Sequence, residues 1–424
     1  MSHPSADPAV NAVAARLVGL AAADPSRARI LEFGCGSGHH LLPLAARWPE
    51  AEFTGIDHDP DALELARGLA AEAGLANAVF RVGGLEDWAG QGGYDFIIAH
   101  GVFSWVPDVV KLALFRQIHA HLAPSGVAVV SFNVAAGWRH RMPLVAKARA
   151  IQQAGEDVDL MRALDILRDV CESDAERVIV DDMMAKGAAV LAHDDFASVC
   201  DPFSLADFAA LAAHHGLRWL GEGVPADNLP VGDACVDAAA FGDDALAIQN
   251  ALDEAGGRTF RSVLLCRADA AIAEKVSASV VSSCFLSRGP SPYEGDVVLQ
   301  RALEVCAPRD VLAGELIDRH GPTIASHVVE AIYQGAVAAR THPAEVRSSV
   351  PDRPRMDQLR LACARRMLPI VDARHVPCLF PAAHCEFLGM MDGTRGLADL
   401  EKDSPRDLDF QPWMLHLAHR GFFG

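Results

Sequence analysis

The residues with the clearest chemical meaning lie between positions 28 and 57. An apolar run ends in Glu32, and three glycines follow at alternate positions, namely Gly34, Gly36 and Gly38. A second apolar run ends in Asp57, 19 residues after the last of these glycines. Glycines at this spacing let the backbone turn tightly and approach a ligand, because a Cβ there would collide with it. A carboxylate at the end of the next strand can accept hydrogen bonds from two ribose hydroxyls, so the segment predicts a nucleoside-binding α/β unit.

The spacing of the glycines distinguishes two kinds of nucleoside site. Dinucleotide-binding enzymes such as nicotinamide-dependent dehydrogenases carry Gly-x-Gly-x-x-Gly, whereas this chain carries Glu-x-Gly-x-Gly-x-Gly. The pattern resembles motif I of class I S-adenosylmethionine-dependent methyltransferases, with Asp57 at the position of the ribose-binding acid. The resemblance implies S-adenosylmethionine as cofactor and S-adenosylhomocysteine as product. The cofactor-binding residues that we expect are Glu32, Gly34, Gly36, Gly38, Asp57, His58, Leu85, Glu86, His100 and Gly101.

Alternating apolar and amphipathic segments predict the elements that position these residues. We expect strands at 30–33, 53–57, 78–82, 94–99 and 127–133, and helices at 8–23, 41–48, 60–73 and 107–122. This order is typical of a doubly wound parallel α/β sheet that binds its ligand at the carboxyl ends of the strands. A seven-stranded methyltransferase sheet needs one more helix and two more strands. We expect these at 204–215, 217–221 and 261–267.

The same segments predict the domain organisation. Residues 1–270 read as one catalytic domain with a helical insertion at about 140–195, and residues 271–292 read as a linker because Ser287–Pro292 is rich in Pro, Gly and Ser. Residues 293–424 form a smaller α+β domain in this prediction. Its helical segments at 297–306, 311–319 and 322–334, followed by short strands, suggest a winged-helix-like module.

Composition limits the partners and the location. The 424 residues are 51% hydrophobic and 22% charged, which is typical of a globular protein. The net charge of −19 repels nucleic acid and attracts basic partners, so we expect no nucleic acid as a partner. We expect a cytoplasmic protein without a signal peptide or membrane span, because the first residues and the apolar runs fit neither. The 10 cysteines contain no Cys-x-x-Cys pair and read as reduced thiols.

Motifs outside the glycine loop indicate which group of methyltransferases the chain resembles. They are His100-Gly101-Val102-Phe103-Ser104-Trp105-Val106-Pro107, Ser131-Phe132-Asn133, Gly137-Trp138, Leu191-Ala192-His193-Asp194-Asp195, His215-Gly216-Leu217 and Met391-Asp392-Gly393-Thr394-Arg395. With them the chain resembles, over nearly its whole length, bacterial methyltransferases that carry a methyltransferase regulatory domain. Characterised members methylate lysines of outer-membrane proteins. This chain has Phe103 and Phe132 where members carry Tyr, so we expect no phenol to orient the substrate.

The catalytic candidates would surround the sulfonium and the nucleophile. We expect this role for His100, Phe103, Trp105, Asn133 and Trp138. The aromatic members would give an apolar, π-lined wall, and the alternative for them is packing in the core. For His100 three roles stay open: a hydrogen bond to cofactor or substrate, a general base, or a packed histidine.

One cluster raises the question of a metal. His375, Cys378, His384 and Cys385 lie within eleven residues, but the adjacent His384 and Cys385 fit one tetrahedral site poorly. We therefore expect no metal.

Taken together, the sequence predicts an S-adenosylmethionine-dependent methyltransferase that modifies a lysine side chain of a protein. A small-molecule N- or O-methyltransferase is the alternative, since the cofactor site would serve it unchanged. A nucleoside-binding regulator without catalysis is the third interpretation. The methyl acceptor, the number of methyl groups transferred and the oligomeric state are not specified by these residues.

Overall fold

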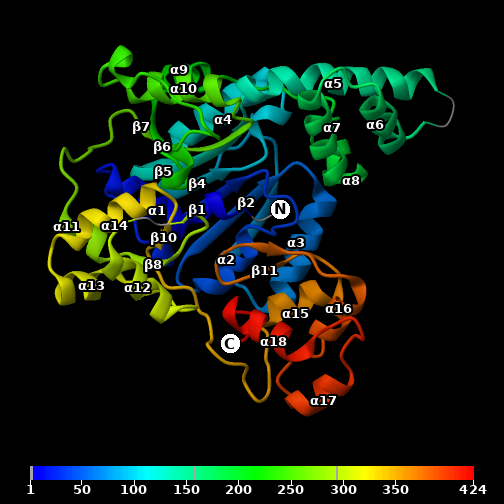
Figure 1. Cartoon of the computed structure of the whole chain (residues 1–424), viewed down its shortest axis with the longest axis vertical. Coiled ribbons are helices and arrows are strands. Elements are labelled where there is room, and N and C mark those ends of the chain that lie inside the picture. The colour runs from blue at the N-terminus through cyan, green and yellow to red at the C-terminus, as the bar shows by residue number, and fades with distance from the viewer. Residues whose placement is uncertain (1–2, 156–157, 293–294) are drawn as a thin grey trace.

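A seven-stranded mixed sheet forms the centre of the molecule in the computed structural model, which describes residues 3–155, 158–292 and 295–424 (Figure 1). The strand order is β3-β2-β1-β4-β5-β7-β6. The strands are β1 (Arg29–Phe33), β2 (Glu52–Asp57), β3 (Ala78–Val82), β4 (Tyr94–Ala99), β5 (Leu122–Asn133), β6 (Leu217–Glu222) and β7 (Phe260–Arg267). Only β7 runs antiparallel to its neighbours β5 and β6. The predicted α/β methyltransferase sheet is confirmed, including its two late strands.

Helices cover both faces of this sheet. Along β5, Val127 and Val129 belong to one core, whereas Ala128 and Val130 belong to the other, because successive side chains point to opposite faces. The first core includes residues of α1 (Pro8–Leu17), α2 (Leu41–Arg47) and α3 (Pro60–Ala73). The second includes residues of α4 (Asp108–His121) and α9 (Leu205–His214), and α10 (Ala245–Gly256) lies beside α9.

Local sequence signals explain where α3 begins and ends. The carboxylate of Asp59 accepts hydrogen bonds from the backbone N–H groups of Asp61 and Ala62 at 2.9 and 3.2 Å, and Pro60 opens the helix. Gly74 ends it with a left-handed φ of 69°. The predicted helix 60–73 is therefore confirmed. The predicted helix 8–23 stops earlier, at Leu17, because the backbone turns at Gly19 with φ 91°.

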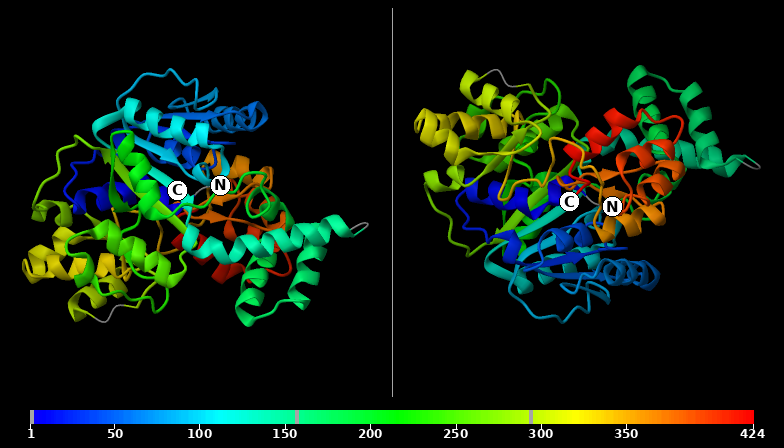
Figure 2. Two further views of the ribbon diagram at one scale, coloured as in Figure 1. Left: turned by 90° about the horizontal axis from the view of Figure 1, so that it is seen from above. Right: turned by 90° about the horizontal axis from the view of Figure 1, so that it is seen from below.

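A helical arm projects from the sheet, as Figures 1 and 2 show. It consists of α5 (Ala135–Ala154), α6 (Leu160–Asp169), α7 (Asp174–Lys186) and α8 (Ala188–His193). The arm has a small apolar core of its own. Buried Arg141 joins its two ends by ion pairs to Asp195 and Asp182. The predicted insertion is helical as expected, although α5 begins before residue 140.

The chain after β7 forms two lobes. The first contains α11 (Ala278–Ser282), β8 (Phe285–Arg288), α12 (Val297–Cys306), β9 (Val311–Leu312), α13 (Ala313–His320), α14 (Ile324–Tyr333) and β10 (Val337–Arg340). Its sheet is antiparallel in the order β10-β8-β9. The middle strand β8 precedes the helices and lies inside the predicted linker, so the winged-helix prediction is not confirmed.

The second lobe shares its core with the catalytic sheet. It contains α15 (Gln358–Arg365), β11 (Ile370–Val371), β12 (Pro377–Cys378), α16 (Ala382–Leu388), α17 (Leu397–Lys402) and α18 (Phe410–His419). Phe387, Leu400 and Met414 of this lobe belong to the same buried cluster as Leu44 of α2 and Leu63 of α3. The lobe is thus part of one packed body with the catalytic unit.

Short 3-10 helices complete the secondary structure. They are Pro4–Ala6, Pro25–Arg27, Phe103–Trp105, Pro225–Asn228 and Ala238–Phe241. Throughout the described ranges, no helix has both the length and the hydropathy that crossing a bilayer requires.

Candidate cofactor and substrate site

The glycine loop lies where β1 ends, and its three glycines have distinct tasks. Gly34, Gly36 and Gly38 all have left-handed φ values, of 71°, 50° and 73°. A Cβ at Gly34 would lie 2.5 Å from Val102, and one at Gly38 would lie 3.0 Å from Phe80, so both positions need glycine for packing. A Cβ at Gly36 would meet no described atom within 4 Å. Gly36 therefore faces open space, as a residue beside a ligand must.

Asp57 fixes the shape of this loop. Its Oδ2 accepts a hydrogen bond from the backbone N–H of Gly36 at 2.7 Å, and its Oδ1 accepts one from Asp59 at 3.0 Å. A carboxylate has about four acceptor positions, so capacity remains for ribose hydroxyls. His58 is 91% exposed and touches only the Asp57 carboxylate among its described ionic partners, at 3.2 Å. His58 therefore lies beside the ribose-binding candidate Asp57, and its role in cofactor binding stays a prediction.

Four buried polar atoms around the loop have no hydrogen-bond partner in the described part of the chain. They are Oε2 of Glu32 and the Nε2 atoms of His39, His40 and His100. Burial raises the pKa of Glu32 to about 8, and the nearby Asp57 carboxylate acts in the same direction. Buried polar atoms of this kind normally have partners. Their presence beside an open glycine loop fits a ligand that brings its own charged and hydrogen-bonding groups, as the amino-acid end of S-adenosylmethionine does.

The remaining predicted cofactor residues lie after β3 and β4. Gly101 has φ 71° and open space at its Cβ position, and its N–H donates a 2.8 Å hydrogen bond to Oγ of Ser131. Leu85 is half-buried, and its carbonyl accepts a hydrogen bond from the Gln117 side chain at 2.9 Å. Glu86 is exposed. Gly101 is therefore placed to line the cleft, whereas Leu85 and Glu86 form part of its outer edge.

His100 sits in a stack of rings at the carboxyl end of β4. Its imidazole lies 4.2 Å from that of His3, nearly parallel to it, and 5.8 Å from the ring of Phe260. Burial, with further contributions from the charges of His3 and His40, holds the pKa of His100 well below its usual value. His100 is consequently neutral at pH 7, and it can accept a proton or a hydrogen bond. His3 and Phe260 were not among the predicted site residues, since nothing in the sequence connects them to β4.

Phe103 is a core residue rather than a wall of the site. Its side chain is fully buried and lies within 6.2 Å of the rings of Phe115, Phe132, Phe203 and Phe208. Phe132 is stacked on Phe208 in the same cluster. The catalytic role expected for Phe103 is therefore wrong, because its ring is buried and packs against other rings of this cluster.

Trp105, Trp138 and Asn133 lie together beyond β5. Trp105 is half-buried, and its ring meets that of Trp138 edge-on at 6.1 Å. Trp138 is buried, and its Nε1–H donates to the carbonyl of Thr259 at 3.0 Å. This hydrogen bond fixes the ring of Trp138 against which Trp105 packs. The backbone of Asn133 donates to Oγ of Ser104 at 2.8 Å. Of these three residues, Trp105 is the one that is half-buried rather than buried.

A histidine from the second lobe reaches the glycine loop. Nε2 of His375 lies 3.0 Å from Nδ1 of His40, and both rings are buried. His375 sits at the turn between β11 and β12 with a left-handed φ of 64°, in which its N–H donates to the Asp372 carbonyl. The sequence offered His375 only as a possible metal ligand. Its contact with His40 joins positions 335 residues apart, which no local pattern reveals.

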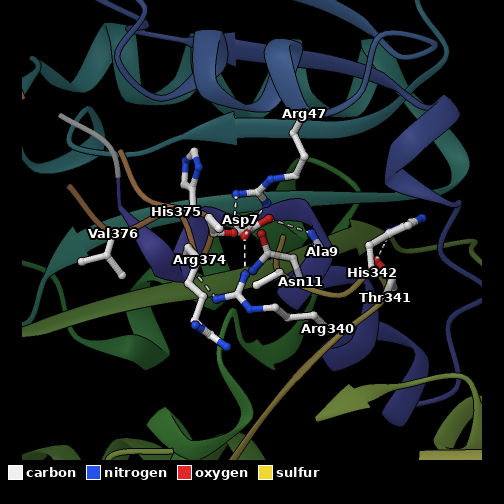
Figure 3. Close-up of polar contacts among 12 residues, drawn as sticks. Asp7, Ala9, Asn11, Arg47, Arg340, Thr341, His342, Arg374, His375 and Val376 are labelled. Carbon is white, nitrogen blue, oxygen red and sulfur yellow. Dashed lines mark hydrogen bonds and ion pairs between the residues drawn. The ribbon is translucent and has the colours of Figure 1, made fainter. Parts of the chain in front are cut away.

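A buried ionic network surrounds this contact (Figure 3). Asp7 is fully buried, and its carboxylate accepts hydrogen bonds from Arg340 at 2.6 Å, Arg47 at 3.3 Å and the backbone of Ala9 at 2.9 Å. Although burial opposes this, the two guanidinium groups lower the pKa of Asp7. The network ties the start of the chain to α2 and to β10. The three segments next to the glycine loop are thereby held in one arrangement.

The suspected metal cluster is dispersed. His375 pairs with His40, His384 lies 3.3 Å from Asp407, and the thiol of Cys385 contacts the carbonyl of Phe380. Within residues 3–155, 158–292 and 295–424, no three His, Cys, Asp or Glu side chains are grouped as a metal ion requires.

Comparison with known proteins places this site in a family. Residues 30–126 match the family model of the methyltransferase domain, and residues 187–267 match that of the predicted methyltransferase regulatory domain. The second match includes β6 and β7, so the regulatory unit supplies two strands of the catalytic sheet.

Individual relatives agree with these matches. An uncharacterised protein of Rickettsia prowazekii is 26% identical over 283 residues, which cover 62% of this chain and 50% of that protein. Trans-aconitate 2-methyltransferase of Afipia carboxidovorans is 35% identical over 102 residues, 24% of this chain and 37% of the enzyme. The chain spans about half the length, or less, of the curated relatives that it matches best.

A solved structure shares the whole fold. PKMT2 from Rickettsia typhi, in complex with AdoHcy, matches with a TM-score of 0.82 and 19% identity, over 98% of this chain and 95% of PKMT2. The likeness therefore includes both lobes and the helical arm. The sheet and the glycine loop thus have the fold of a class I S-adenosylmethionine-dependent methyltransferase, and two segments of the chain match the methyltransferase domain and the predicted methyltransferase regulatory domain.

Proposed function

We propose that this chain transfers the methyl group of S-adenosylmethionine to the side-chain amine of a lysine in a protein. The observation that carries the proposal is the set of uncharged rings at the carboxyl edge of the sheet. They are the neutral imidazole of His100, the ring of Phe260, which lies 5.8 Å from it and is 37% exposed, and the half-buried ring of Trp105, which follows β4. These side chains remove water from an incoming amine and bring no charge of their own.

The chemistry needs an amine without its proton. Lysine has a free pKa of about 10.4, so only about one side chain in 2,500 is neutral at pH 7. Apolar surroundings lower that pKa because they penalise the ammonium form. Nε2 of His100, which is buried and has no hydrogen-bond partner in the described part of the chain, can accept a hydrogen bond or the departing proton.

The cofactor supplies the electrophilic methyl group when it is bound. The protein then has to align the amine with this group and exclude water, since the departing thioether needs no proton. Asp57 and Gly36 would hold the nucleoside, and Glu32 with His40 would face the amino-acid end. Phe103, Phe132 and Trp138 keep Trp105 and Asn133 in position through packing.

Two further observations support a protein acceptor. PKMT2, which has the same fold over nearly its whole length, is by its name a protein lysine methyltransferase. In addition, the net charge of −19 favours encounter with a lysine-bearing, cationic partner.

A small-molecule acceptor is the second candidate, and the match to trans-aconitate 2-methyltransferase favours it. That match covers only 24% of the chain.

Fractionation of labelled products distinguishes the two candidates. Purified protein is incubated with methyl-labelled S-adenosylmethionine and a bacterial lysate, and the label is counted separately in protein and in small molecules. The proposal predicts label in protein, and it predicts none with the Asp57→Ala variant. Label confined to small molecules would replace the lysine proposal with the second candidate.

A further inference from the structure

A cavity of about 410 Å³ lies apart from the cofactor cleft, between α2 and the second lobe. Apolar side chains from both sides line it, among them Leu42 and Ala46 of α2, Leu359 and Cys363 of α15, Ile370 of β11 and Phe423. A dry cavity of about 150 Å³ already admits benzene. The space here is large enough for a two-ring molecule and lies in the size range of ligand pockets.

The charges around this cavity are paired within the protein. Arg47 binds Asp7 at 3.3 Å, Arg360 binds Asp357 at 2.7 Å, and Asp372 binds Arg420 at 2.7 Å. Glu345 also lines the cavity, but it is exposed to water. Because the enclosed charges already have opposite charges beside them, an ionic ligand would gain little and would have to be desolvated. The cavity is therefore suited to an uncharged ligand.

One polar atom in the wall has no partner in the described part of the chain. Nδ1 of His39 lies 2.6 Å from Oγ of Ser37, whereas its Nε2 is buried without a hydrogen bond. Burial lowers the pKa of His39 to about 4, so the ring is neutral at pH 7. A neutral imidazole nitrogen pairs with a single hydrogen-bonding group of a ligand.

Two parts of the cavity wall are connected to the cofactor site. His39 directly follows Gly38, the last glycine of the loop. Ile370–Ala373 belong to the β11–β12 hairpin, whose tip places His375 against His40. Arg47 joins the two walls, because its Nη2 donates to the carbonyl of Ala373 at 3.0 Å. A ligand braced between α2 and the hairpin would hold both of these connections in place.

We propose that this cavity is an effector site for an uncharged, mainly apolar molecule of about two rings. Occupancy strengthens binding of the cofactor, because it stabilises α2 and the hairpin in the arrangement that orients His40. By linkage, the cofactor must strengthen binding of the effector by the same factor.

Indole is a suitable probe, because it has two fused rings, no charge and one N–H donor. Its binding to the full chain is measured by ligand-observed NMR, with Ala46→Phe as the variant that fills the cavity and Ala71→Phe as the control. Both alanines are exposed on helices, and only Ala46 lines the cavity. We expect indole to bind the native protein and Ala71→Phe, and to lose binding in Ala46→Phe.

Coupling is measured by titrating S-adenosylhomocysteine with and without saturating indole. We expect its affinity to rise at least about threefold in the native protein and to stay unchanged in Ala46→Phe. Indole that occupied the adenine position instead would lower this affinity. A lower or unchanged affinity, retained binding to Ala46→Phe, or no binding up to the solubility of indole would each overturn the proposal. The NMR arm uses no cofactor, so a failure of the proposed cofactor site is recognised separately.

Discussion

Nε2 of His375 lies 3.0 Å from Nδ1 of His40, and this contact brings the second lobe to the N-cap residue of α2, the helix that follows the glycine loop. The pair is buried beside the Asp7, Arg47 and Arg340 network (Figure 3). The contact holds the ring of His40 in one orientation and leaves its other nitrogen, Nε2, without a hydrogen bond in the described part of the chain. The second lobe thereby acts on the cofactor site through one defined side chain.

Replacing His375 tests this role. We expect His375→Ala to weaken S-adenosylhomocysteine binding by about tenfold, since a hydrogen bond that orients a ligand contact contributes about 1.4 kcal/mol. His375→Asn keeps a polar group and should recover part of that affinity. Calorimetry measures both variants, and thermal unfolding identifies any general loss of stability. Equal cofactor affinity in the native protein and in a folded His375→Ala variant would contradict the role.

Gly36 and Gly74 offer a matched pair of glycines. Both have a left-handed φ and open space at the Cβ position, but only Gly36 faces the cleft, whereas Gly74 ends α3. Alanine at either position costs about 1–2 kcal/mol of stability because of the left-handed backbone. We expect only Gly36→Ala to lose cofactor affinity as well, by more than tenfold. Calorimetric titration of the two variants decides this, and similar affinities would remove Gly36 from the ligand contact.

Much of the catalytic sheet can be predicted from the sequence because its signals are local. Asp59, Pro60 and Gly74 define both ends of α3, and the two late strands follow from short apolar runs. Leu63 of α3 and Phe387 of α16 belong to one buried cluster although they lie far apart in the chain. The same is true of Asp7 with Arg340, so neither packing nor ion pair has a signature in the sequence.

In the candidate site, too, some residues are predicted by a local motif, whereas others are placed only by the fold. The glycines and Asp57 form a motif with fixed spacing, and the structure places them together. Phe103 and Trp105 are only two residues apart and equally aromatic, yet Phe103 is fully buried in a cluster of rings and Trp105 is half-buried. Which way each ring points is set by the short 3-10 helix Phe103–Trp105, and this turn has no clear sequence signal.

Glu32 makes stability depend on pH in a defined direction. Its pKa is raised to about 8, so between pH 4.5 and about 8 the folded protein retains a proton that the unfolded chain releases. The free energy of unfolding therefore decreases as pH rises through this range. Glu32→Gln removes the effect and should be more stable than the native protein at pH 8, by about 1 kcal/mol or more, and less different at pH 5.

Thermal unfolding without cofactor at the two pH values measures the effect, with the exposed Glu86→Gln as control. We also expect Glu32→Gln to bind S-adenosylhomocysteine about tenfold more weakly, since an amide cannot ionise to pair with the ammonium group of the ligand. A stability difference that did not change with pH would show that Glu32 is ionised in the folded protein.

We expect a smaller side chain at Trp105 to lower turnover, and a smaller side chain at Phe103 to lower stability. Trp105→Ala removes a face of the cleft and should lower turnover at least about tenfold, with cofactor affinity nearly unchanged. Phe103→Leu disturbs a buried ring cluster and should lower stability by about 1–3 kcal/mol, with turnover of the folded fraction preserved. Turnover measured with lysate protein, together with thermal unfolding, separates the two. Normal turnover in Trp105→Ala would exclude it from the acceptor site.

The central claim concerns the atom that receives the methyl group. The most direct measurement is fragmentation mass spectrometry of lysate proteins that become labelled when the full chain and methyl-labelled S-adenosylmethionine are added. The account predicts label on the side-chain nitrogen of lysine, in amounts that disappear with Gly36→Ala and fall with Trp105→Ala. Label on another side chain, on a terminal amine or on small molecules alone would contradict it.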